Sequence, residues 1–295
     1  MIDPAALVAA LGAAVCRFDI DVLPRCDSTN AVLLARAEAG AASGTVVVAE
    51  EQTAGRGRRG REWIAAPGDS LTFSVLWRFA PGVVPIGLSL TVGVAVVRAL
   101  QKVMRSGIQP DSAGDTPQSK YPRGVALKWP NDILFQGKKL GGILVELVPG
   151  APHAAVIGIG INQRLPATLP PDVRATAAAL DGVMASQVDN CTLLATVLSE
   201  LLAVLESFSL AGFSALRPDW LAWHAFQDAP VVLLADFSPP QQGICRGVDN
   251  EGALLLETDG RIERILSGEI SLRPAAPPGA LREGMDPASN FVVSR

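Results

Sequence analysis

Residues 126–162 read ALKWPNDILFQGKKLGGILVELVPGAPHAAVIGIGIN, and this stretch carries the clearest fold signal in the chain. Its apolar runs predict strands over residues 126–129, 143–148 and 154–161, and Gln136-Gly137-Lys138 predicts the turn after residues 132–135. These strands follow one another without a helix between them. Strands and helices therefore do not alternate strictly along the chain, which indicates an α+β fold.

The rest of the N-terminal part adds two strands and several helices to this pattern. The segments GTVVVAE (44–50) and SLTFSVLWRF (70–79) predict strands. Helices are predicted over residues 5–16, 31–39, 85–104, 190–208 and 216–226, with Asn190 as the cap of the fourth. We expect a mixed β-sheet with flanking helices over residues 1–227, interrupted at 106–123 by a flexible insertion rich in Ser, Gly, Pro and Asp.

The C-terminal part has a different pattern, in which short strands alternate with polar turns. Strands are predicted over residues 231–235, 243–248, 253–258 and 262–266, with turns at 249–252 and 259–260. This spacing predicts a small β-barrel domain over residues 228–274. The last residues, 275–295, contain several prolines and little pattern, and we expect a loose tail.

The composition limits the classes of partner. A net charge of −4 and a pI near 5.3 argue against a surface built to wrap nucleic acid, because affinity for phosphate backbones depends on clustered Lys and Arg. No run of 18 apolar residues is uninterrupted, and Asp3 and Pro4 stand where a secretory signal carries basic residues. We therefore expect a cytoplasmic protein that does not bind membranes.

The side chains that could act as nucleophiles are few and scattered. The four cysteines lie far apart without a CxxC pair, so neither a zinc site nor a disulfide framework is indicated. The two histidines, His153 and His224, are not beside a candidate Ser or Cys, and GxSxG and HExxH motifs are absent. Chemistry in which both reacting groups belong to the substrates therefore fits this sequence best.

The richest local motif is GRGRRGR at residues 55–61. Arginine donors match phosphate oxygens, and glycines let backbone N–H groups approach an anion closely, so the loop is suited to phosphate. Its GxGxxG spacing does not indicate a dinucleotide fold, because Pro67 and Gly68 follow before a strand and no helix begins there. From composition alone, a solvated arginine loop or a nucleic-acid patch fits equally well.

Three further motifs have both a functional and a structural interpretation. KWPND (128–132) places Lys128 at a strand end, although an ordinary surface lysine or a tight turn would look the same. Ser28-Thr29-Asn30 can present polar groups to a ligand or simply cap a helix, and Gln52 alone is uninformative. The glycines in KKLGGILVE and GIGIN can reflect strand packing, or together a shallow floor for a flat ligand.

Taken together, these motifs resemble those of the biotin protein ligase family in order and spacing. The resemblance covers residues 20–274 and is carried by STN (28–30), Gln52, GRGRRGR (55–61), KWPND (128–132), KKLGGILVE (138–146), GIGIN (158–162) and SGEISLR (267–273). It implies a catalytic domain followed by a small SH3-like β-barrel. It also implies that biotin and MgATP form biotinyl-5′-AMP, from which a lysine of a biotin carboxyl carrier domain takes the biotin.

The same resemblance assigns roles to individual residues. Lys128 and Arg58 would be catalytic, and biotin would contact Ser28, Thr29, Asn30, Gln52, Arg56, Gly57, Arg58 and Lys128. ATP or the adenylate would contact Arg56, Arg58, Arg61, Trp63, Asn131, Lys139, Asn162 and Arg273, and Asp132 would help to hold Mg²⁺. A positioned lysine and arginines would offset the repulsion between the two anions that must meet.

The resemblance also leaves alternatives. Some family members carry an N-terminal DNA-binding domain of about 60 residues, whereas 27 residues precede Ser28 here, and we expect no DNA binding. One alternative is a lipoate ligase or acyl transferase of the same broad fold. The other is a noncatalytic biotin-sensing regulator.

Overall fold

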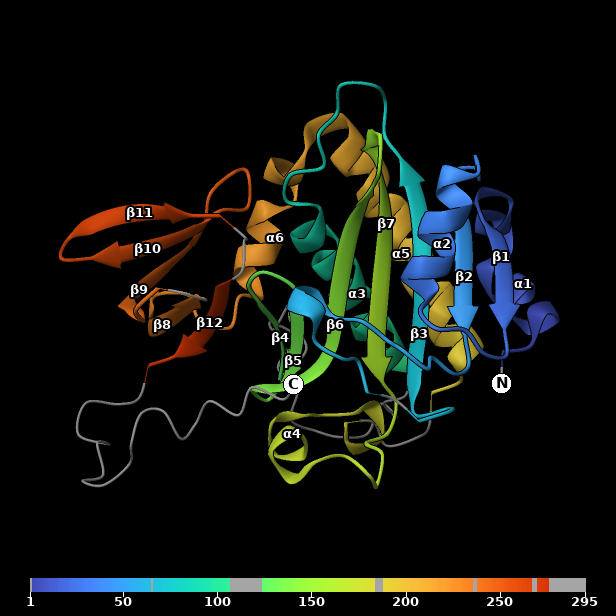
Figure 1. The fold of residues 1–295 in the computed structure, drawn as a ribbon, viewed down its shortest axis with the longest axis horizontal. Helices are drawn as coiled ribbons and strands as arrows, with labels where there is room; N and C mark the ends of the chain where they lie inside the picture. Colours follow the sequence, from blue (N-terminus) through green and yellow to red (C-terminus); the bar gives the residue numbers. More distant parts are fainter. Residues whose placement is uncertain are drawn as a thin grey trace.

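A seven-stranded mixed sheet forms the centre of the larger unit (Figure 1). The computed structural model describes residues 2–64, 66–106, 124–183, 188–235, 238–266 and 270–275. The strands are β1 (Asp19–Leu23), β2 (Thr45–Ala49), β3 (Ser70–Arg78), β4 (Val125–Lys128), β5 (Asp132–Phe135), β6 (Lys138–Val148) and β7 (Ala151–Asn162), in the order β1-β2-β3-β7-β6-β5-β4. The β1–β2 pair is parallel and the other pairs are antiparallel, so the predicted mixed sheet is confirmed.

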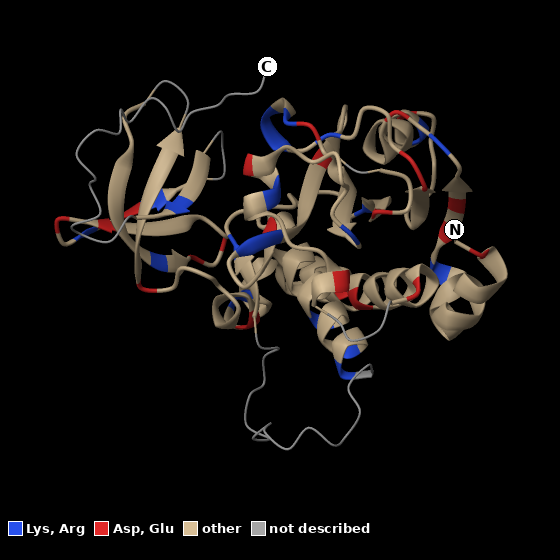
Figure 2. Cartoon of the chain, turned by 90° about the horizontal axis from the view of Figure 1, so that it is seen from below, with Lys and Arg blue, Asp and Glu red and all other residues tan. Residues whose placement is uncertain are grey.

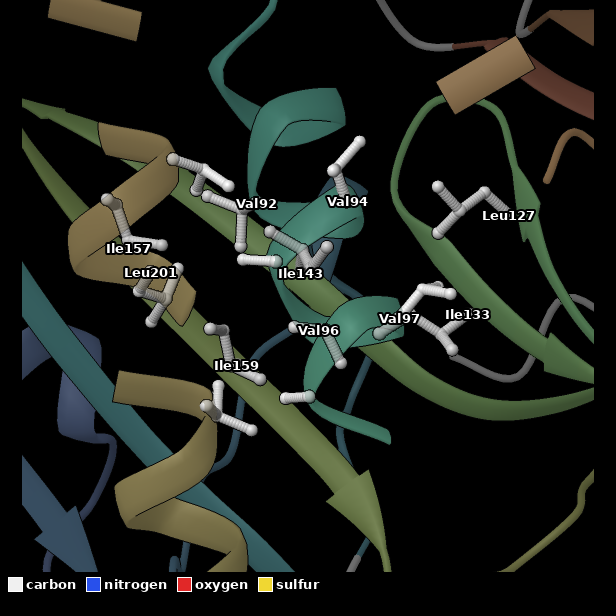
Figure 3. Packing of buried hydrophobic residues seen from close by; sticks show 14 of the residues in the cluster. Val92, Val94, Val96, Val97, Leu127, Ile133, Ile143, Ile157, Ile159 and Leu201 are labelled. Carbon is white, nitrogen blue, oxygen red and sulfur yellow. The ribbon is translucent and has the colours of Figure 1, made fainter. Parts of the chain in front are cut away.

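Helices cover both faces of this sheet. On one face, α3 (Leu88–Ser106) packs against β4, β5 and β6, and α5 (Asn190–Ala211) packs against α3. Figure 3 shows the valines of α3, among them Val92 and Val96, against Ile143 of β6 and Ile159 of β7. On the other face, α2 (Thr29–Glu38) packs against β2, β3, β6 and β7. Side chains alternate between the two faces of a strand, so successive residues of one strand face helices on opposite sides of the sheet.

Helix α5 is long and apolar enough to cross a membrane by length and composition, with a mean hydropathy of 1.7 over its most apolar window. In this structure it is a core helix, with Leu194, Leu198, Leu201 and Leu205 buried. Its N-cap is Asp189, whose carboxylate accepts from the Thr192 backbone N–H at 2.9 Å, so the predicted cap at Asn190 is wrong by one residue. An aspartate oxygen caps as well as an asparagine oxygen and also carries the charge that a helix N-terminus favours.

The short helices differ from the predicted boundaries. The segment predicted as one helix over 5–16 divides into α1 (Pro4–Leu11) and a 3-10 helix (Gly12–Arg17), because Gly12 takes a φ of 54° and ends the α-helix. The segment 216–226 contains α6 (Arg217–Ala222), preceded by a 3-10 helix at Phe213–Ala215. The short helix α4 (Pro171–Thr176) and a 3-10 turn at Leu180–Gly182 follow β7.

The second unit is a five-stranded antiparallel sheet. Its strands are β8 (Ala229–Ala235), β9 (Gln241–Val248), β10 (Leu254–Thr258), β11 (Arg261–Ile265) and β12 (Ile270–Pro274), in the order β11-β10-β9-β8-β12. The four predicted strands are confirmed, and β12 is an addition. The predicted insertion at 106–123, apart from Ser106 at the end of α3, and the predicted tail, apart from Ala275, lie outside the described residues.

Two hydrogen bonds, one buried and one partly buried, attach the second unit to the first. Trp129, directly after β4, donates from Nε1 to the Gly252 carbonyl at 3.0 Å, and Arg217 of α6 donates from Nε to the Val248 carbonyl at 2.7 Å. Gly252 has a φ of 83°, and an added Cβ would lie 2.4 Å from Leu90 Cδ1, so the turn before β10 needs glycine at this point. Figure 2 shows Lys, Arg, Asp and Glu interspersed over both units.

Candidate active site

A single pocket gathers most of the residues predicted to be functional. It opens on the α2 face of the large sheet and is lined by the start of α2, the loop after β2, the segment 128–132, strands β6 and β7, and Ile270–Leu272 of β12. The predicted residues that line it are Ser28, Thr29, Asn30, Gln52, Arg56, Gly57, Arg58, Arg61, Trp63, Lys128, Asn131, Asp132 and Lys139. Segments more than a hundred residues apart in sequence therefore meet in one cavity.

One end of the pocket is polar and is built from the start of α2. Ser28 is the N-cap residue, but its side chain makes no capping hydrogen bond, so its hydroxyl is not used to begin the helix. The Thr29 backbone N–H donates to Gln52 Oε1 at 2.8 Å, and Thr29 Oγ1 lies 3.2 Å from the same oxygen. Ser28, Thr29 and Asn30 are each at most 4% exposed. Helix capping alone therefore does not explain why these three polar side chains are buried beside the pocket.

Two residues behind this polar end were not predicted from the sequence. Ser74 of β3 is fully buried, and its Oγ lies 2.8 Å from Thr29 Oγ1 and 2.6 Å from Asn30 Oδ1. Glu146 of β6 accepts from Asn30 Nδ2 at 2.7 Å. A serine inside an apolar strand and a glutamate near the end of another were visible signals, because both place a polar side chain on a buried sheet.

The glycines of β6 and β7 form the floor of the pocket. Gly142 pairs with Gly160 and Leu144 with Gly158 across the two strands. A Cβ at Gly158 would lie 2.2 Å from Asn30 Oδ1, and a Cβ at Gly160 would lie 2.6 Å from the Trp63 ring. These glycines therefore line the pocket and make room for Asn30 and for the indole of Trp63, and a flat ligand on this floor stays a prediction.

Lys128, Asp132 and Lys139 form a compact charged cluster at the other end. Lys128 Nζ lies 3.0 Å from Asp132 Oδ2, and Lys139 Nζ lies 2.7 Å from Asp132 Oδ1. Burial alone would raise the pKa of Asp132, but the two ammonium groups outweigh it and lower that pKa to about 2. Burial lowers the pKa of Lys128 from its ordinary value, against the opposing effect of Asp132. The two ammonium groups make this end of the pocket suitable for binding anions.

The arginine loop lines the pocket as a folded turn. The Gly57 backbone N–H donates to the Arg61 carbonyl at 2.7 Å, and the Trp63 N–H donates to the Gly55 carbonyl at 2.9 Å. Arg58 begins a short 3-10 turn and donates from Nη1 to Asn131 Oδ1 at 3.3 Å. Burial lowers the pKa of Arg58. Strand β3 follows the loop, which confirms that its glycine spacing does not mark a dinucleotide fold.

Two predicted site residues lie outside the pocket lining. Asn162 donates from Nδ2 to the Ala178 carbonyl at 2.9 Å, which anchors the loop after β7. Arg273 of β12 is exposed, although its charge contributes to lowering the pKa of Lys128. Its neighbours Ile270, Ser271 and Leu272 do line the pocket, and although they belong to the SGEISLR motif, no site role was predicted for them.

The described residues contain no cluster of three or more His, Cys, Asp and Glu side chains that could hold a metal. All four cysteines are free thiols, as expected. The carboxylates that line the pocket belong to Glu62 and Asp132. A metal at this site would therefore depend on oxygen ligands from a substrate as well as from the protein.

Sequence comparisons place the chain beside proteins of known activity. The model of the "Biotin/lipoate A/B protein ligase family" matches residues 22–162, and that of the "Biotin protein ligase C terminal domain" matches residues 239–273. The chain is 38% identical over 259 residues to the bifunctional ligase/repressor BirA of Escherichia coli, covering 87% of this chain and 74% of that protein. It is 34% identical to the biotin--[acetyl-CoA-carboxylase] ligase of Mycobacterium tuberculosis, covering 85% and 88%.

Solved structures agree with these sequence matches. The biotin protein ligase of Aquifex aeolicus in complex with biotin and ATP superposes with a TM-score of 0.71 at 30% identity. The superposition covers 87% of this chain and 99% of that chain. The ligase of Leishmania major in complex with biotinyl-5-AMP gives a TM-score of 0.53 at 27% identity, covering 84% and 98%.

Proposed function

Because this chain belongs to the biotin protein ligase family, we propose that its pocket joins biotin to AMP and then transfers the biotin to a lysine of a carrier protein. The chain is an ATP-dependent biotin ligase. The observation that carries the residue assignment is the arrangement of the pocket itself. One end presents neutral hydrogen-bonding groups, the other presents Lys128 and Lys139, and the arginine loop lies between them.

This arrangement suits the first step of the reaction. An oxygen of the biotin carboxylate forms a bond to the α-phosphorus of ATP, and the bond from that phosphorus to pyrophosphate breaks. The products are biotinyl-5′-AMP and pyrophosphate. Two anions must approach each other, so we assign Lys128 to the reacting oxygens and Arg58 to the developing phosphate charge. Ser28, Thr29, Asn30 and Gln52 would hold the polar ring of biotin at the far end, with Arg56 and Gly57 along its chain.

The nucleotide would lie toward the arginine loop and the second unit. Arg56, Arg58 and Arg61 would bind phosphates, and Trp63, Asn131 and Lys139 would border the adenylate. Asn162 and Arg273 remain proposed nucleotide contacts, for which side-chain movement would be needed. The loop would exclude water from the reactive anhydride.

Asp132 fits a contribution to a magnesium site only in part. Both of its oxygens accept hydrogen bonds from lysines, and no other residue of the segment 128–132 carries a carboxylate. Magnesium usually takes one or two protein carboxylates and completes its shell with phosphates and water. Bound with ATP, the ion would neutralise phosphate charge, while Asp132 would hold Lys128 and Lys139 in position.

In the second step a lysine amine of the carrier attacks the carbonyl carbon of the mixed anhydride. An amide bond forms as the nitrogen releases a proton, the bond from that carbon to the phosphate oxygen of AMP breaks, and AMP leaves. We propose the carrier domain of acetyl-CoA carboxylase or a related carboxylase as the acceptor, by similarity to relatives named for that reaction. We also propose that the protein acts in the cytoplasm, without DNA or membrane as partners.

The domain assignment is likewise a proposal. Residues 1–227 would form the catalytic domain, with 106–123 as an insertion, and residues 228–274 would close into an SH3-like barrel, with 275–295 as a tail. The β12 contribution to the pocket supports a role for the second domain in catalysis.

A direct assay separates biotin from lipoate as the substrate. Pyrophosphate release is measured with ATP and either acid. We expect release with biotin, and release with lipoate alone would overturn the proposed substrate. If a DNA duplex were bound and no biotinylated carrier formed, the chain would instead be a regulator.

A further inference from the structure

A series of close polar contacts runs behind the polar end of the pocket, from Glu146 to Gln52. Glu146 Oε2 accepts from Asn30 Nδ2 at 2.7 Å, and Ser74 Oγ lies 2.6 Å from Asn30 Oδ1. Ser74 Oγ also lies 2.8 Å from Thr29 Oγ1, which is 3.2 Å from Gln52 Oε1. These groups come from α2, β3, β6 and the loop after β2. Their contacts join four segments of the fold.

The Glu146 carboxylate fixes which of these groups donate hydrogen bonds and which accept them. A carboxylate accepts hydrogen bonds and does not donate them, so Asn30 must turn its NH₂ group toward Glu146. The second N–H of that group reaches the Leu144 carbonyl at 3.4 Å. Asn30 Oδ1 therefore faces Ser74, and the Ser74 hydroxyl must donate to it.

The donor and acceptor roles of the groups at the pocket wall follow in the same way, because each hydroxyl has a single proton to donate. Ser74 gives its proton to Asn30, so its contact with Thr29 requires Thr29 to donate. Gln52 Oε1 already accepts from the Thr29 backbone N–H at 2.8 Å. Thr29 Oγ1 and Gln52 Oε1 are then two acceptors 3.2 Å apart, both on residues that line the pocket. Adjacent acceptors favour a ligand that donates an N–H between them.

The same reasoning places a donor nearby. Since Gln52 Oε1 faces Thr29, its amide nitrogen points the other way, and a Cβ built on Gly55 would lie 3.1 Å from it. The groups that the polar end presents beside Thr29 are therefore the two adjacent acceptors, Thr29 Oγ1 and Gln52 Oε1. A cyclic urea supplies an N–H donor for these acceptors, whereas a dithiolane ring has no N–H group.

We propose that Glu146 and Ser74 are positioning residues. They fix which atoms of Asn30 and Thr29 donate and which accept hydrogen bonds, and thereby select a ureido ring. The proposal rests on the proposed function, since it assigns specificity to the same pocket. Reversing these donor and acceptor roles would turn Asn30 Oδ1 toward the Glu146 carboxylate oxygen, which lies 2.7 Å from the Asn30 amide, and would bring two acceptors together without a proton between them. Neither residue needs to touch the ligand for this role.

The test compares biotin with analogues in which one ureido N–H is replaced by oxygen, which changes a donor into an acceptor with little change in size. The KM for biotin and for each analogue is measured by pyrophosphate release, because KM does not depend on the fraction of folded enzyme. The variants are Glu146→Gln, which can pair with Asn30 in either orientation, and Ser74→Ala. Glu206→Gln is the matched control, because Glu206 pairs with Arg17 on the surface of α5.

We expect the wild type and Glu206→Gln to prefer biotin over at least one analogue by about tenfold or more. In Glu146→Gln and Ser74→Ala this preference should fall to about threefold or less, with the KM for ATP unchanged. Preference retained at the wild-type level in either variant, or a parallel rise in the KM for ATP, would overturn the proposal. No turnover of biotin by the wild type would instead contradict the proposed function itself.

Discussion

Lys128 Nζ lies 3.0 Å from Asp132 Oδ2, across the turn that joins β4 to β5. The other oxygen of Asp132 accepts from Lys139, so one carboxylate holds two ammonium groups in a small volume where they would otherwise repel each other. Both side chains of the Lys128–Asp132 pair are largely buried, at 14% and 16% exposed. The lysines are thereby positioned before any phosphate is bound.

Replacing Lys128 by alanine should lower the maximal rate of adenylation by about a hundredfold or more, the scale for removing one positioned electrostatic donor. The reason is that Lys128 would act where charge accumulates as the two anions meet. Single-turnover pyrophosphate release measures this rate. Lys138→Ala, at an exposed site on β6, is the control. A raised KM for biotin with a normal maximal rate would contradict the role.

Replacing Arg58 by glycine should leave adenylation partly active but allow biotinyl-AMP to escape. Arg58 connects the loop to Asn131 at 3.3 Å, so its removal loosens the loop over the pocket. Rapid gel filtration with labelled biotin measures the fraction of intermediate that stays bound. Equal retention by the variant and the wild type would show that Arg58 does not hold the loop closed.

Replacing Gly158 by alanine should raise the KM for biotin by about tenfold, the effect of losing a hydrogen-bonded polar contact. The added Cβ would fall 2.2 Å from Asn30 Oδ1, so Asn30 must move. Gly182→Ala is the matched control, because nothing lies within 4 Å of its Cβ position. A normal KM for biotin in a folded Gly158→Ala protein would show that the position of Asn30 is unimportant.

Replacing Trp129 by phenylalanine should destabilise the protein by about 1–3 kcal/mol, since it leaves the buried carbonyl of Gly252 without its donor. The hydrogen bond of 3.0 Å links the segment 128–132 to the turn before β10. Urea unfolding followed by far-UV circular dichroism gives the change. A difference near zero would mean that another donor replaces the indole.

Stability should fall as the pH drops from about 6.5 toward 4. Burial lowers the pKa of His224 to about 4 from an ordinary value of 6.5, so the unfolded chain binds a proton that the folded chain does not. This stabilisation is complete above the unfolded pKa and is lost as the pH falls, by up to about 3 kcal/mol. His224→Phe, which keeps a ring against Trp220, should flatten the unfolding free energy over this window. An unchanged pH slope would contradict the assignment.

Local patterns predicted most of the fold because they are set by neighbouring residues. The β-branched run at Thr45–Ala49 and the apolar helix α5 were recognisable from periodicity alone. Strands β1 and β12 were not predicted, since each is short and gains its stability by pairing with a neighbour, β1 with β2 and β12 with β8. Helix α1 ended earlier than its apolar pattern suggested, because the conformation of Gly12 was not visible in the sequence.

The site was predictable as a set of motifs but not as a network. Motif spacing identified Thr29, Lys128 and the arginine loop, and each of these lines the pocket. Ser74 and Glu146 were missed, because their roles depend on strand register. Ser74 pairs with Gly158 across β3 and β7, and Glu146 lies on β6, the next strand in the order of the sheet. Register across a sheet follows from tertiary pairing, which one sequence does not display.

Intact mass spectrometry of a carrier domain incubated with this protein, biotin and ATP tests the proposed function most directly. We predict the addition of one biotinyl group to a single carrier lysine, dependent on ATP and abolished or strongly slowed by Lys128→Ala. No added mass with biotin, or an added mass only when lipoate replaces it, would contradict the assignment of this pocket as the site of biotin ligation.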